Sequence, residues 1–160
     1  MNRDADRFAR WVKTHRSFLT RAAWALTGER AAAQDLVQET FALAWRHRAA
    51  LRDDGAVQAW LYRILRREAI RHWERRPPWD AWRDELPDTV AAAPRSEDLR
   101  IDLLRALQAL SEPHREILVL FYLADMSYEE LARSLDIAPG TVMSRLNRAR
   151  AALKALLGED

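Results

Sequence analysis

The feature that most constrains this chain is the spacing of its apolar residues, which recur every three or four positions along most of its 160 residues. This spacing puts apolar side chains on one face of a helix and does not suit the two-residue alternation of a half-buried strand. Only 4 glycines are present, and the strong helix formers Ala, Leu, Arg and Glu dominate. The sequence therefore predicts an all-α fold.

Three helices are expected in the first half, at about residues 4–26, 29–47 and 56–75. Gly28 suits the end of the first helix, because a helix often closes on a residue with a left-handed backbone. A polar loop rich in Asp and Gly precedes the third helix. Short loops of this kind predict three helices that pack on one another.

The composition changes at residue 77. Residues 77–96 hold four prolines and an excess of acids, which disfavour both a helix and a packed core. A segment of this length spans roughly 60 Å when extended. We therefore expect two small helical domains, 1–76 and 97–160, joined by a flexible linker.

Charge is distributed unevenly, although the net formal charge is only +2. Residues 1–76 carry 16 Lys and Arg against 9 Asp and Glu, whereas residues 77–98 carry 2 against 6. Residues 99–160 are close to neutral, with 8 against 9. A basic front half favours nucleic acid as a partner.

Several function classes find no support in the sequence. There is no cysteine, which removes disulfides and thiolate metal sites. The four histidines are scattered without metal-ligand spacing, and no glycine-rich phosphate loop is present, which disfavours an enzyme and predicts no metal or cofactor. No stretch approaches the ~20 apolar residues of a membrane span, so we expect a cytoplasmic chain without membrane insertion.

The last third of the chain has the spacing of a helix-turn-helix. Ser127 and Glu130 form a capping box at the start of a short helix, and Ala132 is small enough for a second helix to cross it. Asp136 tolerates the left-handed backbone of a tight turn, and Pro139 suits the first turn of the last helix. Ser111 is the expected N-cap of the preceding helix.

The last helix is expected to enter the major groove of DNA, because the N-terminal part of a recognition helix reaches base edges. Its inward side is predicted to hold Val142, Leu146, Ala149, Leu153 and Leu156. An ordinary solvated amphipathic helix is the alternative for its polar side. The residues predicted to contact DNA are Thr141, Met143, Ser144, Arg145, Asn147 and Arg148.

Four segments together resemble the extracytoplasmic-function (ECF) sigma factors of bacterial RNA polymerase. Residues 126–132 read MSYEELA and residues 139–150 read PGTVMSRLNRAR, similar to sigma region 4. That half alone also resembles the output domain of response regulators. The front half favours sigma factors, because residues 35–41 read DLVQETF and residues 60–64 read WLYRI, similar to region 2.

The resemblance implies that the chain binds core RNA polymerase and recognises a promoter. Asp35, Gln38 and Glu39 lie at i, i+3 and i+4 and share one helix face. This acid-bearing face is similar to the one that sigma factors dock on the coiled coil of the beta-prime subunit. Region 4 in turn implies contact with the beta flap and with the minus-thirty-five element. A plain solvated surface is the alternative reading of the first face.

The third helix is basic and can follow a phosphate backbone. In sigma factors this helix and the loop before it, here about 51–57, hold the melted minus-ten element with one base flipped into a loop pocket. Trp60 falls on the apolar stripe and is expected in the core, whereas Trp73 suits either packing or stacking. The residues expected at the minus-ten element are Arg63, Arg66, Arg67, Arg71 and Trp73.

Two positions depart from the family pattern. Arg67 stands where the family often has Asn, and is then expected to contact phosphate rather than a base. Met143 stands where the family often has Arg or Lys, and offers only apolar contact, for instance to a thymine methyl.

The resemblance also implies an anti-sigma protein, which can be membrane-anchored, that covers the polymerase-binding faces. One rival hypothesis is a promoter-binding regulator that does not load polymerase, which leaves the Asp35–Glu39 face without a purpose. A second is a helical RNA-binding protein, which leaves the recognition helix unexplained.

Overall fold

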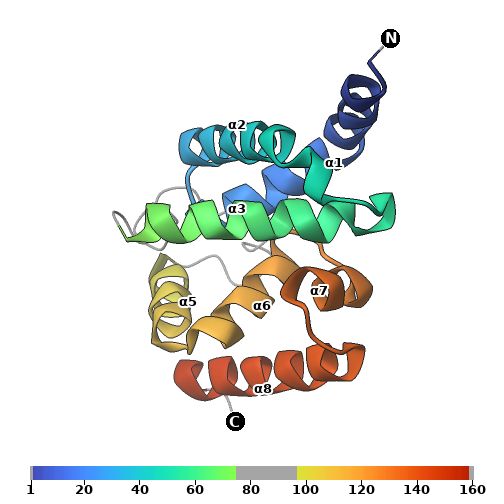
Figure 1. Cartoon of the computed structure of the whole chain (residues 1–160). Helices are drawn as coiled ribbons and strands as arrows, with labels where there is room; N and C mark the ends of the chain where they lie inside the picture. Colours follow the sequence, from blue (N-terminus) through green and yellow to red (C-terminus); the bar gives the residue numbers. More distant parts are fainter. Residues whose placement is uncertain (1, 75–96, 159–160) are drawn as a thin grey trace.

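A computed structural model describes residues 2–74 and 97–158, and the described residues contain helices and turns only. Figure 1 shows α3 lying across the middle of the molecule, with α1 and α2 on one side and the later helices on the other. The predicted linker, 77–96, lies outside the described residues. The helices are α1 (Arg3–Thr27), α2 (Arg30–Arg46), α3 (Val57–Trp73), α5 (Glu97–Ala109), α6 (Glu112–Tyr122), α7 (Tyr128–Leu135) and α8 (Pro139–Leu157).

The helix ends follow the local signals in the sequence. Gly28 closes α1 with φ 68°, and its N–H donates to Trp24 O at 2.8 Å. The capping box at Ser127 is complete: its Oγ accepts from Glu130 N at 3.1 Å, and its N–H donates to Glu130 Oε2 at 2.8 Å. Asp136 takes the left-handed conformation with φ 55°. Ser111 occupies the N-cap of α6 but makes no side-chain cap bond.

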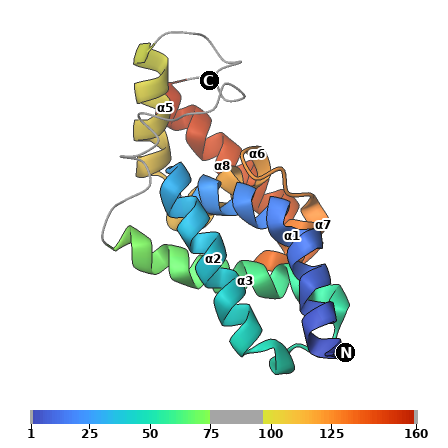
Figure 2. The same ribbon diagram turned by 90° about the horizontal axis from the view of Figure 1, so that it is seen from above.

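The first three helices pack on one another as a small bundle, seen from above in Figure 2. Fully buried alanines on α1, such as Ala22 and Ala25, let the neighbouring backbones approach closely. Leu19, Leu61 and Leu65 fill the space between these helices and are 0% exposed. The prediction of three helices that pack on one another is confirmed.

The later helices build the helix-turn-helix on a second patch of core. The inward side of α8 consists of Val142, Leu146 and Ala149, each 0% exposed. The prediction that Leu156 points inward is wrong, because it is 48% exposed. The fully buried positions of α8 end at Ala149, Leu153 is only partly buried, and Leu156 lies beyond both.

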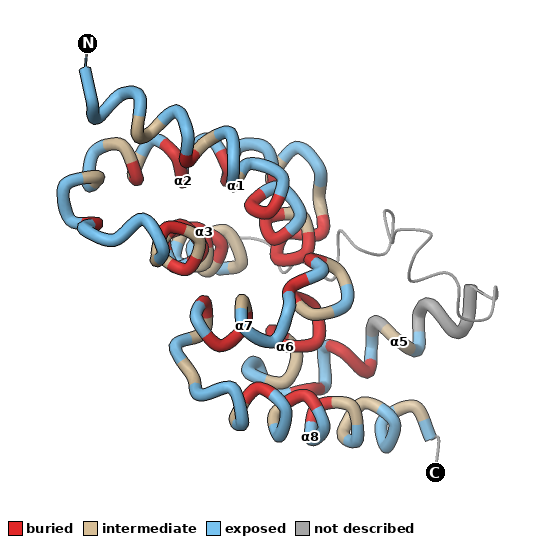
Figure 3. Tube along the Cα trace, turned by 90° about the vertical axis from the view of Figure 1, so that its right-hand side faces the viewer, coloured by how far each residue is buried: buried red, intermediate tan, exposed pale blue. Residues whose placement is uncertain are grey.

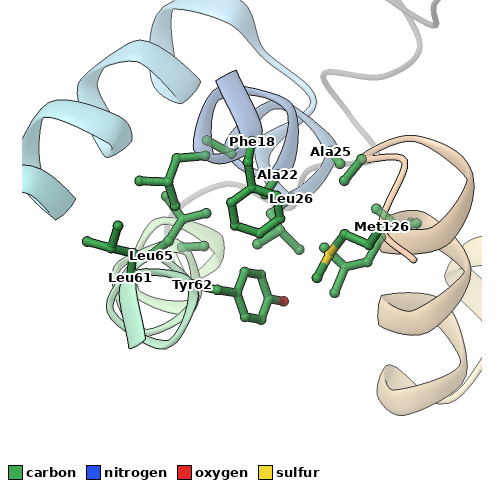
Figure 4. Packing of buried hydrophobic residues seen from close by; sticks show 14 of the residues in the cluster. Phe18, Ala22, Ala25, Leu26, Leu61, Tyr62, Leu65 and Met126 are labelled. Carbon is green, nitrogen blue, oxygen red and sulfur yellow. The ribbon is translucent and has the colours of Figure 1, made fainter. Parts of the chain in front are cut away.

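The two halves are docked on each other, an arrangement that the sequence left open. Helix α3 contacts α7, and α1 contacts α6. Figure 3 shows buried positions on both sides of this junction. Figure 4 shows the ring of Tyr62 between the α1 residues Phe18 and Leu26 and Met126 of the other half. One continuous apolar cluster therefore includes residues of both halves.

The two N-cap serines provide a matched test of this geometry. Ser127→Ala removes the Oγ that accepts from Glu130 N, although the N–H of residue 127 remains, and is expected to lower the free energy of unfolding by about 1 kcal/mol. Ser111→Ala removes a hydroxyl that makes no cap bond and is expected to change it much less. Urea unfolding followed by helical circular dichroism measures both, and equal losses would contradict the assigned capping box.

Candidate nucleic-acid and polymerase interfaces

The outward side of α8 carries the residues predicted to touch DNA. Ser144, Asn147 and Arg148 are exposed, whereas Thr141 and Arg145 are half-buried on one flank. Arg148 lies along the helix, and its Nε donates to Ser144 O at 3.2 Å. Met143 is 53% exposed on the opposite flank. The helix thus presents a polar, cationic surface, with Met143 as its apolar point.

An aromatic cluster beside α8 was missed at the level of sequence. Arg150 Nε donates to Tyr122 Oη at 2.8 Å, and its guanidinium lies 5.4 Å from the centre of the Phe121 ring. The bond to Tyr122 is the main cause that raises the pKa of Arg150. Tyr128 stacks at a tilt on Phe121, 5.5 Å away. The available signal was the three aromatic residues at the end of α6 and the start of α7, Phe121, Tyr122 and Tyr128, whose spacing is not periodic.

The acid-bearing face of α2 is exposed as the spacing predicts. Asp35, Gln38 and Glu39 are all exposed, while Leu36 and Val37 face the core. Within the described part of the chain, no hydrogen bond or ion pair engages the three polar side chains. This surface is therefore available to a partner.

The arginines of α3 divide into two sets. Arg67 and Arg71 are exposed, and Arg71 Nη1 is 3.5 Å from Glu68 Oε1 on the same helix. Arg63 instead reaches the end of α7, where its Nη2 donates to Arg133 O at 3.2 Å and lies 3.8 Å from Asp136 Oδ1. The sequence placed all of these on one basic helix but could not show that some face the other half.

Arg66 belongs to a buried network that joins the halves. Its Nε donates to Glu116 Oε1 and its Nη2 to Glu116 Oε2, the latter at 3.1 Å. Tyr62 Oη donates to the same carboxylate at 2.8 Å. Glu116 is 8% exposed and Tyr62 0%. Burial, and then the charge of Glu116, raise the pKa of Tyr62 well above its ordinary value, so its hydroxyl remains the donor.

The two tryptophans of α3 are packed rather than free. Trp60 lies edge-to-face on Trp11, with ring centres 5.9 Å apart, which agrees with its expected place in the core. Trp73 is half-buried, and its Nε1 donates to Leu26 O at the end of α1. The polar edge of Trp73 is thus occupied.

The loop between α2 and α3 contains two short 3₁₀ turns, η1 (Arg48–Ala50) and η2 (Asp54–Ala56). Its tip, Arg52 to Gly55, is exposed, whereas Leu51 and Val57 are buried and anchor its two sides. Asp53 accepts from Gly55 N at 2.9 Å and so begins the second turn. Arg7 of α1 contacts this loop through Leu51 and Asp54.

Neither metal-binding nor membrane-spanning features occur in the part of the chain that the structure describes. Its His, Asp and Glu side chains form no group of three or more that could hold a metal ion. Its helices are too short or too polar to cross a membrane.

Two family models match the chain in sequence order. A model described as sigma-70 region 2 matches residues 11–77, and one described as sigma-70 region 4 matches residues 100–153. Together they cover most of the chain. Their order agrees with the resemblance of the four short segments.

Curated proteins of similar length share about a third of their residues with this chain. An RNA polymerase sigma factor, CarQ of Myxococcus xanthus, is 35% identical over 159 residues, covering 96% of this chain and 88% of that protein. The ECF RNA polymerase sigma factor SigL of Mycobacterium tuberculosis is 34% identical over 151 residues, covering 91% and 85%. The ECF sigma-E factor of Salmonella typhimurium is 37% identical over 134 residues, covering 74% and 70%.

Two solved structures have a similar fold. CnrH in complex with the cytosolic domain of CnrY gives a TM-score of 0.60 at 28% identity, covering 94% of this chain and 87% of that one. The sigma factor RpoE of Bartonella quintana, in complex with the anti-sigma factor NepR, gives a TM-score of 0.61 at 31% identity. The match covers 96% of this chain and 98% of that one.

The raised pKa of Tyr62 predicts a loss of stability in alkali. Its folded pKa lies above the unfolded value of about 10, so the bond contributes stability below that pH and loses it as the pH rises through the folded pKa. Denaturant unfolding at pH 7 and above pH 10 should show a steeper loss for the native chain than for Tyr62→Phe. Parallel losses in both proteins would contradict the assignment.

Proposed function

Because this chain belongs to the extracytoplasmic-function sigma factors of bacterial RNA polymerase, we propose a division of labour between its two halves. The family is a class of non-enzymatic transcription initiation factors. Domain 1–76 is proposed to bind core polymerase and the minus-ten element, and domain 97–160 the minus-thirty-five element. Residues 77–96 are proposed as the linker between the two domains. The observation that carries this proposal is the order of the two matched regions, each with its expected polar face exposed.

The α2 face is proposed as the contact with the coiled coil of the beta-prime subunit. Asp35, Gln38 and Glu39 are exposed and unengaged within the described chain, and two of the three are acidic. Such a face attracts a basic partner surface and steers its approach. The second half is proposed to contact the beta flap, so that polymerase holds both domains.

Helix α8 is proposed to lie in the major groove at the minus-thirty-five element. The exposed polar side of its first turns supports this role, since hydroxyl and guanidinium groups there reach bases and phosphates. Met143 offers an apolar contact that suits a thymine methyl. The proposed contacts are Thr141, Met143, Ser144, Arg145, Asn147 and Arg148.

At the minus-ten element the two sets of α3 arginines have different availability. Arg67 and Arg71 are exposed and can meet phosphates directly. Arg63 is also exposed, although it donates to Arg133 O of the other half, whereas Arg66 is held by the buried Glu116 and is released to DNA only when the halves separate. Trp73 can then stack on a base only if its bond to Leu26 O opens as well. We infer that the docked arrangement is a closed state that polymerase loading opens.

Control by an anti-sigma factor is proposed on the strength of the solved neighbours. CnrH was solved with the cytosolic domain of CnrY, and RpoE with the anti-sigma factor NepR. A partner of this kind, which can be membrane-anchored, would cover the same faces and hold the closed state. The chain itself is proposed to act in the cytoplasm, where core polymerase and promoter DNA are found.

Transcription with purified components tests the proposal. Core polymerase from the source organism, given genomic fragments, should start at a small set of sites only when this chain is added. Start-site mapping reads the result. DNA binding without any gain in specific initiation would favour the promoter-binding regulator instead.

Two substitutions should separate the roles of the halves. Asp35→Lys reverses a charge on α2 and should weaken core-polymerase binding about tenfold, because a rim charge then repels a basic partner. Arg148→Ala should leave core binding intact and weaken minus-thirty-five DNA binding of the holoenzyme about tenfold. Asp102→Lys, an exposed charge reversal on α5, is the control, with core binding measured for the isolated beta-prime coiled coil so that contacts of the second half do not contribute. Equal effects of Asp35→Lys and Asp102→Lys would refute the assigned face.

The closed state has a test of its own. Glu116→Gln keeps the volume and an acceptor for Tyr62 but removes the charge paired with Arg66, which should shift the equilibrium toward the open form about tenfold. X-ray scattering should report a larger radius of gyration. Glu112→Gln, whose carboxylate is 3.7 Å from Arg66 and well exposed, is the matched control. An unchanged radius for Glu116→Gln would contradict the inferred role.

A further inference from the structure

The tip of the loop between α2 and α3 is tied to the first turns of α1 by Arg7, whereas Arg48, at the start of the loop, pairs with Asp4 of α1 at 3.4 Å. Arg7 Nη2 donates to Leu51 O at 3.0 Å, and Arg7 Nε donates to Asp54 Oδ1 at 2.8 Å. One guanidinium thus holds a backbone carbonyl at the start of the loop tip and a carboxylate at its end. The planar guanidinium fixes the angle between its two bonds, which a lysine would not do.

The helical turn that carries Arg7 is packed against aromatic side chains. Its neighbour Phe8 packs edge-to-face on Trp45, with ring centres 5.1 Å apart, and on Phe41 at 6.2 Å. The Arg7 guanidinium lies 4.7 Å from the centre of the Trp11 ring, a cation–π position. Arg7 therefore joins the loop to a packed aromatic cluster rather than to a mobile helix end.

Arg7 also neutralises a charge that would disfavour DNA. The loop tip carries two neighbouring acids, and Asp53 is already bound to Gly55 N. The bond to Arg7 is the main cause that lowers the pKa of Asp54, so its carboxylate stays ionised and paired.

We propose that Arg7 is the positioning residue of the minus-ten loop, holding Leu51–Ala56 in the one conformation that receives a flipped base. This rests on the proposed function of the loop as a base pocket. Arg7 precedes residues 11–77, the segment that matches sigma-70 region 2, so its role is not part of the matched region. A pocket held ready in this way binds more tightly, because less of the loop must be ordered when the base enters.

The test uses holoenzyme made from core polymerase and the full chain. A fluorescent single-stranded minus-ten oligonucleotide is compared with copies that carry one abasic site, and the site that weakens native binding most marks the flipped base. Arg7→Gln should weaken binding of the intact strand about five- to tenfold. Binding of the abasic strand at that site should change less than twofold, since no base enters the pocket.

Arg3→Gln is the matched control, because it removes the same charge from the same end of α1 without a contact to the loop. Both binding constants should stay at the native values in this variant. A loss in Arg3→Gln equal to that in Arg7→Gln would show a general charge effect and overturn the proposal.

Charge and geometry are separated by a double variant. Arg7→Gln combined with Asp54→Asn removes the unpaired acid but still lacks the bond to Leu51 O. Positioning predicts that the double variant stays defective on the intact strand. Full recovery would mean that Arg7 acts only by neutralising Asp54, and would overturn the positioning role.

Hydrogen exchange distinguishes failure of this inference from failure of the proposed pocket. The amides of Gly55 and Ala56 bond to Asp53 and should exchange faster in Arg7→Gln than in Arg3→Gln. If the exchange rates of these two amides are the same in both variants, the positioning role of Arg7 is overturned even if the base pocket exists. If no abasic site weakens the native holoenzyme, the pocket itself is refuted, and the role of Arg7 with it.

Discussion

The docking of the two halves depends on one desolvated carboxylate. Glu116 of α6 is 8% exposed, and the partners that compensate its burial, Tyr62 and Arg66, both come from α3. A buried carboxylate without such partners loses several kcal/mol of hydration. Tyr62 also packs in the apolar cluster that includes residues of both halves, where Figure 4 shows its ring near Met126. The network therefore fixes which face of α3 is covered.

A buried ion pair of this kind specifies an arrangement more than it stabilises one, because the Coulomb gain is largely offset by desolvation. DNA phosphates offer Arg66 the same bidentate geometry that Glu116 offers it. In the proposed open state, a phosphate would compensate the charge of Arg66 after Glu116 is released. Polymerase binding to the exposed α2 face is proposed to supply the free energy that offsets exposure of the apolar cluster between the halves.

Local sequence signals were sufficient to predict the helices and their ends, but not how the two halves dock on each other. The capping box at Ser127 and the left-handed Asp136 act over a few residues, so the sequence predicted them correctly. The bond from Arg66 to Glu116 joins residues 50 positions apart, and no periodic pattern distinguishes Arg66 from the exposed Arg67. The prediction for Leu156 was wrong for a related reason: its spacing is helical, but the fully buried positions of α8 end at Ala149, and spacing alone does not show where packing stops.

The two arginine contacts differ in what happens to them when the halves separate. Arg7 and Asp54 both belong to the first half, so their bond survives opening and keeps the loop in place. Arg66 and Glu116 lie on opposite sides of the segment between the two matched regions, so their bond is lost on opening. In the proposed mechanism, the loop that receives the flipped base therefore stays ordered in both states, whereas Arg66 becomes available to a phosphate only in the open state. The flipped base would then be received without reordering of the loop after the halves separate.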